Sequence, residues 1–202
     1  MNKYLILLAG PPATGKSYLV GIIEKQFPGL YKISPDEFKE NLADSVGFDN
    51  LNEKSKLEVL VWKLYYQALD AYMHVGKEIV LTEYPFSDKQ KDRIERLAKI
   101  YDYRIITIRL VADFGILWNR RMRRDIDPSR HLSHIMTHYH KGDTLSDRLK
   151  ADDLISRDEF YDIIKSRGYN HFELGKLFEI DVSDFSQVDY SGLVKKLSGI
   201  MT

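Results

Sequence analysis

A continuous apolar run that ends in a glycine-rich loop is the feature that most restricts the fold of this chain. Residues 3–9 read KYLILLA, and Gly10, Gly15, Lys16 and Ser17 follow in the pattern G-x-x-x-x-G-K-S. This pattern is typical of a buried parallel strand, a loop and then a helix, here expected over about residues 16–27. The backbone N–H groups of such a loop point inward at one phosphate, and the positive end of the following helix favours the same anion.

The loop therefore predicts a site for ATP and Mg²⁺. Lys16 is expected to reach the β- and γ-phosphates, and the hydroxyl of Ser17 is expected to bind the metal ion. The ATP-binding residues predicted in the loop are Gly10, Pro11, Pro12, Ala13, Thr14, Gly15, Lys16, Ser17 and Tyr18.

Strand and helix patterns alternate along the rest of the chain. Strands are predicted over 3–9, 29–34, 77–83, 103–110 and 177–183, and helices follow them, the longest over 52–75. Capping boxes are predicted for the helices that begin after Ser34, Ser87 and Ser156. The alternation predicts an α/β fold of the P-loop NTPase class, with a five-stranded parallel sheet and helices on both faces. We expect a single kinase-like domain over 1–202, with a lid and an acceptor-side insertion over about 120–176.

Composition excludes several classes of function. Lys and Arg total 30, and so do Asp and Glu, so the formal net charge is zero. A neutral chain does not favour nucleic acid as a partner. The sequence has no cysteine, which excludes thiolate nucleophiles and cysteine zinc sites. The apolar run at the N-terminus is too short for a membrane span, so we expect a cytoplasmic protein without a membrane partner.

The order of four motifs places the chain near a known group. GPPATGKS, KISPDEFKEN, IVLTEYP and LWNRRMRRD follow one another, and the sequence has neither an N-K-x-D guanine-binding motif nor an L-S-G-G-Q signature. Over residues 1–130 the chain resembles the small P-loop kinases, especially the subgroup of chloramphenicol phosphotransferases, phage polynucleotide 5′-kinase and zeta-toxin sugar-nucleotide kinases. The resemblance implies an ATP-dependent phosphotransferase.

Two carboxylates follow strands on the expected ligand edge of the sheet. By the resemblance, Asp36 would accept the proton of the attacking hydroxyl, a role that chemistry requires because an alcohol is a poor nucleophile. Both Asp36 and Glu37 also fit the first turn of a helix, where a carboxylate stabilises the helix dipole, and Asp36 is the favoured base. Glu83 ends the third strand and is expected to contact the acceptor hydroxyl or a magnesium-bound water, or else to be a surface residue.

An arginine-rich helix follows the fourth strand. On a helical wheel Phe114, Leu117, Trp118 and Met122 form one apolar stripe, which we expect in the core. Arg120, Arg123 and Arg124 lie opposite, and Arg121 flanks the stripe. The arginines form either a solvated face or a lid over ATP, and the lid is favoured because guanidinium groups neutralise the charge on a transferring phosphoryl group. By the resemblance, Arg120 would lie near the adenine, and Arg124 or Arg130 would reach the phosphate and act in catalysis.

Four of the six histidines lie within ten residues, as His131, His134, His138 and His140. A metal site, contacts of a lid with phosphate or acceptor, and a surface tract are the three interpretations, and the metal site is the least favoured because no carboxylate lies among them at a ligand-like spacing.

The sequence thus favours a kinase with Lys16, Asp36, Arg124 and Arg130 in catalysis. Asp36 and Glu83 would bind the acceptor, and Ser17 and Glu83 the metal. The acceptor is expected to be a hydroxyl-bearing small molecule or a nucleotide-like compound. The residues that would bind it carry no recognisable motif. A polynucleotide 5′-hydroxyl kinase and an ATP-binding regulator without transfer activity are the alternatives.

Overall fold

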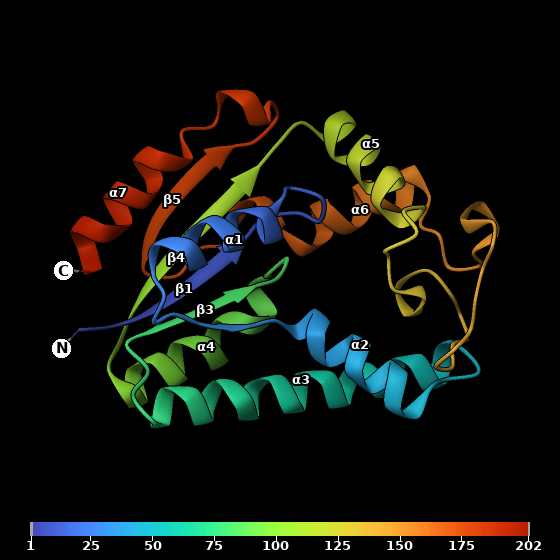
Figure 1. Cartoon of the computed structure of the whole chain (residues 1–202), viewed down its shortest axis with the longest axis horizontal. Helices are drawn as coiled ribbons and strands as arrows, with labels where there is room; N and C mark the ends of the chain where they lie inside the picture. Colours follow the sequence, from blue (N-terminus) through green and yellow to red (C-terminus); the bar gives the residue numbers. More distant parts are fainter. Residues whose placement is uncertain (1, 202) are drawn as a thin grey trace.

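Five parallel strands form one sheet in the order β2-β3-β1-β4-β5 (Figure 1). The structure is a computed structural model, and it describes residues 2–201. The strands are β1 (Lys3–Ala9), β2 (Tyr31–Ile33), β3 (Ile79–Glu83), β4 (Tyr103–Val111) and β5 (Lys176–Asp181). The α-helices of the described residues are α1 (Lys16–Gln26), α2 (Pro35–Val46), α3 (Leu51–His74), α4 (Asp88–Tyr101), α5 (Phe114–Asp125), α6 (Arg157–Arg167) and α7 (Tyr190–Met201).

Helices cover both faces of the sheet, as the apolar run at 3–9 predicts. Leu5 and Leu7 point to the core that α3 and α4 complete, whereas Tyr4, Ile6 and Leu8 point to the core shared with α1 and α7. Side chains alternate along a strand, so an uninterrupted apolar run requires cover on both sides. Within residues 2–201 no helix is both long enough and apolar enough to cross a membrane.

Two of the three predicted capping boxes are present. Ser87 with Gln90 begins α4, and Ser156 with Glu159 begins α6. The third, Ser34 with Glu37, is wrong. The Ser34 hydroxyl accepts a hydrogen bond from the backbone N–H of Asp36 at 3.3 Å, while Glu37 turns away to Lys32, 2.5 Å from its ammonium nitrogen. The ion pair with Lys32 on β2 takes the Glu37 carboxylate away from the start of the helix.

The segment without periodicity, which begins after α5, packs against α2 and the start of α3. Phe48 and Tyr139 exchange backbone hydrogen bonds of 2.8 and 2.7 Å, and both side chains lie in a small core with Ala43, Leu132 and Ile135. In Figure 1 this yellow-orange segment lies beside the far end of α2. It contains short 3₁₀ turns, η1 (Leu132–His134) and η2 (Arg148–Lys150), rather than helices or strands.

Helices α5 and α6 pack together through Leu117 and Phe160, which are both buried. Phe114 and Trp118 join this core, as the helical wheel predicts. The prediction for Met122 is wrong: its side chain is 44% exposed. It lies one turn beyond Trp118 and lines a shallow apolar depression on the outer side of α5, together with Leu149 and Leu154.

Candidate active site

The loop between β1 and α1 has the backbone conformation of a phosphate cradle. Gly10, Ala13 and Gly15 all have positive φ angles, of 110°, 69° and 83°. A Cβ added to Gly10 would lie 2.0 Å from the carbonyl oxygen of Leu110, so no other residue fits there. Successive N–H groups in such a conformation turn toward one side and form an anion-binding concavity.

Lys16 lies at the start of α1 with its ammonium group inside the loop. Its Nζ donates hydrogen bonds to the carbonyl oxygens of Gly10 at 3.1 Å and Pro11 at 2.8 Å. Burial, together with the neighbouring Arg124, lowers the pKa of Lys16 to about 8, although Glu83 and Asp36 act in the opposite direction. An ammonium group that is poorly solvated binds a phosphate anion strongly, because the anion restores the interactions that burial removed.

The next residue, Ser17, connects the loop to the end of β3. Its hydroxyl donates a hydrogen bond of 2.9 Å to Oε2 of Glu83, and burial raises the pKa of the Glu83 carboxyl. Glu83 pairs in register with Leu8 of β1, which places it beside the loop. A hydroxyl and a carboxylate oxygen at hydrogen-bond distance are hard oxygen ligands of the type that Mg²⁺ prefers, so the residues present fit this ion.

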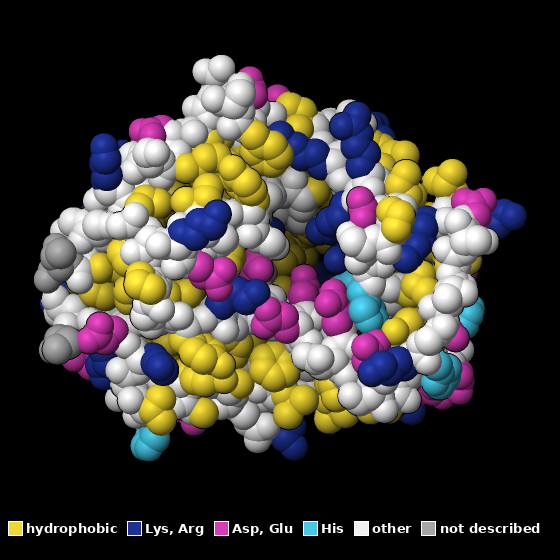
Figure 2. Space-filling view, viewed as in Figure 1, with side chains coloured by type: hydrophobic (Ala, Val, Ile, Leu, Met, Phe, Trp, Pro, Cys, Tyr) yellow, Lys and Arg dark blue, Asp and Glu magenta, His cyan; other side chains and the backbone are white. Residues whose placement is uncertain are grey.

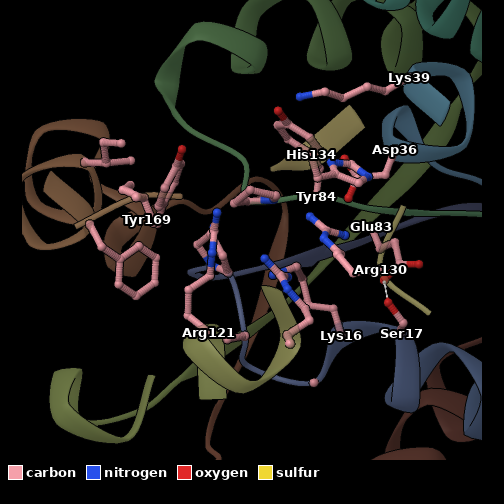
Figure 3. A pocket seen from close by; sticks show the side chains of 18 of the residues that line it. Lys16, Ser17, Asp36, Lys39, Glu83, Tyr84, Arg121, Arg130, His134 and Tyr169 are labelled. Carbon is pink, nitrogen blue, oxygen red and sulfur yellow. Dashed lines mark hydrogen bonds between the residues drawn. The ribbon is translucent and has the colours of Figure 1, made fainter. Parts of the chain in front are cut away.

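Asp36 lies in the first turn of α2 and lines the same cavity as Lys16 and Ser17 (Figure 3). Its negative charge favours the charged forms of Lys16, Arg124 and Arg130. Asp36 therefore both occupies a helix N-terminus and faces the cations of the cavity. Glu37 does not line this cavity.

Three arginines surround one buried carboxylate, that of Asp125, which is 3% exposed. Arg121 donates to it from one turn earlier on α5, Nε of Arg124 lies 3.4 Å from Oδ1, and Nε of Arg130 lies 3.8 Å from the same oxygen. All three arginines line the cavity. Burial and the two neighbouring arginines lower the pKa of Arg124 to about 10. Three cations share one anion, so the cluster keeps excess positive charge for a further anion.

The other two arginines of α5 face elsewhere. Arg120 donates hydrogen bonds to the carbonyl oxygens of Val182 at 2.8 Å and Ser183 at 2.9 Å, and its guanidinium carbon lies 3.7 Å from the centre of the Phe185 ring. The ring would also touch a Cβ added to Gly15, at 3.1 Å. Arg120 is therefore next to the loop but does not line the cavity, and neither does Arg123. Sequence reasoning counted Arg121 among the lid arginines but gave it no role of its own, although Asp125 at i+4 was an available signal.

Each of the four histidines contacts a carboxylate. His131 contacts Asp44, His134 contacts Glu40, His138 contacts Asp152 and His140 contacts Asp49, at 2.7–3.5 Å. Three of these acids belong to α2 or the turn after it. Only His134 lines the cavity, and burial together with Arg130 strongly lowers its pKa. Among the described residues, no group of three or more His, Asp and Glu side chains is arranged to hold a metal ion.

The cavity that these residues share has a volume of about 540 Å³. Figure 2 shows it as a hollow in this face, with basic side chains on one rim and acidic side chains on another. Its further lining consists of Lys39, Tyr84, Pro85, Ile155, Phe160, Ile163 and Tyr169. The first three lie in two of the quoted motifs and the others in regions that carry none. Sequence reasoning gave none of them a role in the site, since they come from four separate segments.

Comparison with solved structures identifies the fold. No protein-family model and no curated sequence matches the chain. A provisionally assigned kinase from Chloroflexus aurantiacus is 22% identical, with a TM-score of 0.75 over 99% of this chain and 96% of that one. The tunicamycin resistance protein of Deinococcus radiodurans is 15% identical (TM-score 0.53, 98% and 95% covered), and a gluconokinase from Sinorhizobium meliloti is 12% identical (TM-score 0.52, 96% and 88% covered).

These likenesses confirm the α/β P-loop fold, with its parallel five-stranded sheet and helices on both faces. The alignments span at least 96% of this chain and at least 88% of the other chain in all three comparisons.

Proposed function

We propose that this protein is an ATP-dependent kinase that moves the γ-phosphate to a hydroxyl of a small-molecule or nucleotide-like acceptor. The observation that carries the proposal is the position of Asp36, which lines one cavity with Lys16, Ser17 and Arg124. Transfer to a hydroxyl requires such a carboxylate, because it orients the alcohol and takes its proton. The names of two of the similar structures, a provisionally assigned kinase and a gluconokinase, agree with a phosphotransferase.

The donor half of the site would hold ATP in the loop, with Lys16 on the β- and γ-phosphates. Ser17 and Glu83 would hold Mg²⁺, which supplies positive charge to the phosphate oxygens when it is bound. Phe185 lies beside Gly15, and the guanidinium group of Arg120 lies over the Phe185 ring. Arg120 would then contact the adenine, as the resemblance implies.

The acceptor half would place the hydroxyl beside Asp36. The carboxylate orients the hydroxyl and takes its proton while the oxygen forms a bond to the γ-phosphorus and the bond from that phosphorus to the leaving ADP oxygen breaks. Arg124 and Arg130 neutralise the charge on the phosphoryl oxygens. Residues 120–176 would then form the lid and acceptor side of a single domain, since Arg124, Arg130, His134 and Tyr169 all line the cavity from this region.

The proposal is tested by ADP release from Mg-ATP, with and without a pool of hydroxylated metabolites and with 5′-hydroxyl oligonucleotides. We expect the metabolite pool to stimulate the release of ADP. The Asp36→Asn variant should bind ATP normally and lose about 100-fold or more of the stimulated rate, since general base catalysis contributes about that much. Glu37→Gln, which changes the neighbouring carboxylate outside the cavity, is the matched control and should keep its activity.

A near-zero rate that no acceptor raises would refute the kinase and indicate an ATP-binding regulator. Stimulation by oligonucleotides alone would identify a polynucleotide kinase instead. Normal turnover of Asp36→Asn would remove Asp36 from the role of base.

A further inference from the structure

The cavity has two unlike walls. Its phosphate side is built from the loop, Asp36, Glu83 and the arginines around Asp125. The rest of its lining, which we call the apolar wall, consists of Tyr84, Pro85, Ile155, Phe160, Ile163 and Tyr169. These residues follow β3, precede or belong to α6, or begin η3 (Tyr169–His171). In Figure 3, Tyr169 lies on the opposite side of the cavity from Ser17.

Two basic side chains of the cavity already have carboxylate partners. The ammonium group of Lys39 lies 2.9 Å from a carboxylate oxygen of Glu58. His134 hydrogen-bonds through Nε2 to Glu40 at 2.7 Å, and burial holds its pKa far below the usual range, so that the ring is neutral and donates. Excess positive charge lies on Lys16 and the arginine cluster, of which Arg121 reaches the apolar wall, with its guanidinium carbon 5.5 Å from the ring centre of Phe160.

Two tyrosines give the apolar wall a limited polar capacity. Burial raises the pKa of both Tyr84 and Tyr169, which keeps their phenol groups neutral. Neutral phenols offer one donor each, whereas a polyol requires a partner for every hydroxyl that it buries. Aromatic rings and isoleucines instead favour a flat apolar group, through burial and edge-to-face contacts.

We propose that the acceptor is an alcohol with an aromatic or otherwise apolar body next to its reactive hydroxyl. The hydroxyl lies at Asp36, and the body lies against the apolar wall. The inference rests on the proposed function for the reaction itself, but the binding site for the apolar body is a separate property of the cavity.

The chain contains a built-in reporter of this binding. It has two tryptophans. Neither lines the cavity, but each one contacts a residue of the apolar wall. The ring centre of Trp62 lies 5.0 Å from that of Tyr84, and the ring centre of Trp118 lies 6.1 Å from that of Phe160. A molecule bound against Tyr84 or Phe160 changes the surroundings of a tryptophan without any chemistry.

The first experiment measures tryptophan emission of the full chain during titration with 2-phenylethanol or benzyl alcohol, with xylitol as a polar alcohol of similar size. The aromatic alcohols should give a saturable change, and xylitol none. The second experiment adds Mg-ATP and measures ADP release, for which the aromatic alcohols should be the better acceptors.

Two matched variants distinguish binding at the apolar wall from a general effect of an added charge on α6. Ile163 is 38% exposed on α6, so Ile163→Asp adds a charge to the apolar wall with little loss of core packing. Ser166→Asp adds the same charge one turn later on the same helix, outside the cavity. Ile163→Asp should weaken the binding of 2-phenylethanol by about 10-fold or more. Ser166→Asp should leave it unchanged, and ATP binding should be the same in both variants.

The outcomes distinguish the two proposals. Binding of 2-phenylethanol that Ile163→Asp weakens supports the apolar site even without ADP release, and the kinase is refuted if neither the aromatic alcohols nor the metabolite pool raises that release. ADP release with xylitol but not with the aromatic alcohols supports the kinase and refutes the apolar acceptor. The absence of a saturable change in emission, or an equal effect of the two variants, also refutes it.

Discussion

The hydroxyl of Ser17 donates a hydrogen bond to Glu83, 2.9 Å away, and so connects the phosphate loop to the end of a neighbouring strand. Sixty-six positions separate the two residues in the sequence. The contact places one oxygen ligand from the start of α1 and one from the end of β3 beside Lys16.

Glu83→Gln should weaken the response to Mg²⁺ and leave the fold intact. The amide oxygen can still accept the hydrogen bond from Ser17, but the negative charge is lost. We expect the Mg²⁺ concentration for half-maximal ADP release to rise by about 10-fold or more, in line with losses at other metal-site carboxylates. A magnesium titration and a thermal melt measure the two properties. An unchanged magnesium requirement with unchanged stability would show that Glu83 does not bind the metal.

ATP binding should weaken as the pH rises above about 8. Burial lowers the pKa of Lys16 to about 8, so the free protein loses the positive charge of this residue above that pH. The phosphates are fully ionised throughout this range, so Lys16 dominates the change. The dissociation constant for ATP should rise by about 10-fold per pH unit above 8, as expected for one linked proton. Calorimetric titrations between pH 7 and 9.5 measure the constant.

Lys16→Arg is the control for this profile, because a guanidinium group stays charged over the whole range. The variant should show weaker binding at pH 7 and a flatter dependence on pH. A dissociation constant of the unaltered protein that stays level to pH 9.5 would contradict the prediction.

Asp125→Asn should destabilise the protein strongly. Asp125 is buried and contacts Arg121, Arg124 and Arg130, so the loss of its charge leaves three cations near one another. Removal of one partner from a buried ion pair costs about 3 kcal/mol or more of unfolding free energy. Urea denaturation measures the change.

Asp127→Asn is the matched control, since Asp127 is exposed and only accepts hydrogen bonds from Ser129. It should have a much smaller effect. Because ATP supplies anions to the arginine cluster, it should stabilise Asp125→Asn more than it stabilises the unaltered protein. Equal losses in the two variants would show that Asp125 is not the central anion of the cluster.

Gly10→Ala should prevent stable folding or cost about 3 kcal/mol or more. The new Cβ would lie 2.0 Å from a backbone oxygen of Leu110, at a φ of 110° that L-residues rarely adopt. Gly21→Ala in α1 is the contrasting variant, since nothing lies within 4 Å of its Cβ position. It should stabilise the helix by about 0.5–1 kcal/mol. Thermal melts compare the two, and a Gly10→Ala protein of normal stability would refute the geometry of the loop.

Local patterns predicted the sheet, the loop and most helix boundaries, because hydrophobic periodicity and capping residues act within a few positions. The predicted helix over 52–75 is found at Leu51–His74, and two capping boxes are confirmed. The two failures depend on what lies beside the helix, which its own pattern does not contain. Glu37 leaves its predicted cap for Lys32 on β2, and Met122 remains exposed on the outer side of α5.

The apolar wall and the segment after α5 were beyond prediction from sequence for the same reason. Lys54 binds Asp153 across 99 positions, and Phe48 pairs with Tyr139. Such contacts leave no periodic pattern of apolar residues in the sequence, so a segment that they stabilise is predicted as a loop. The pairing of each histidine with a distant carboxylate was invisible for the same reason.

Those histidine pairs also have a mechanical consequence. Helix α2 carries Asp36 in its first turn and presents Glu40 and Asp44 further along, where they bind His134 and His131. Arg130 immediately precedes His131 in the chain. Asp36, which would take the proton, and Arg130, which would neutralise the phosphate, are thus connected through α2 and its histidine partners. A movement of α2 that changes the width of the cavity would displace both of them together.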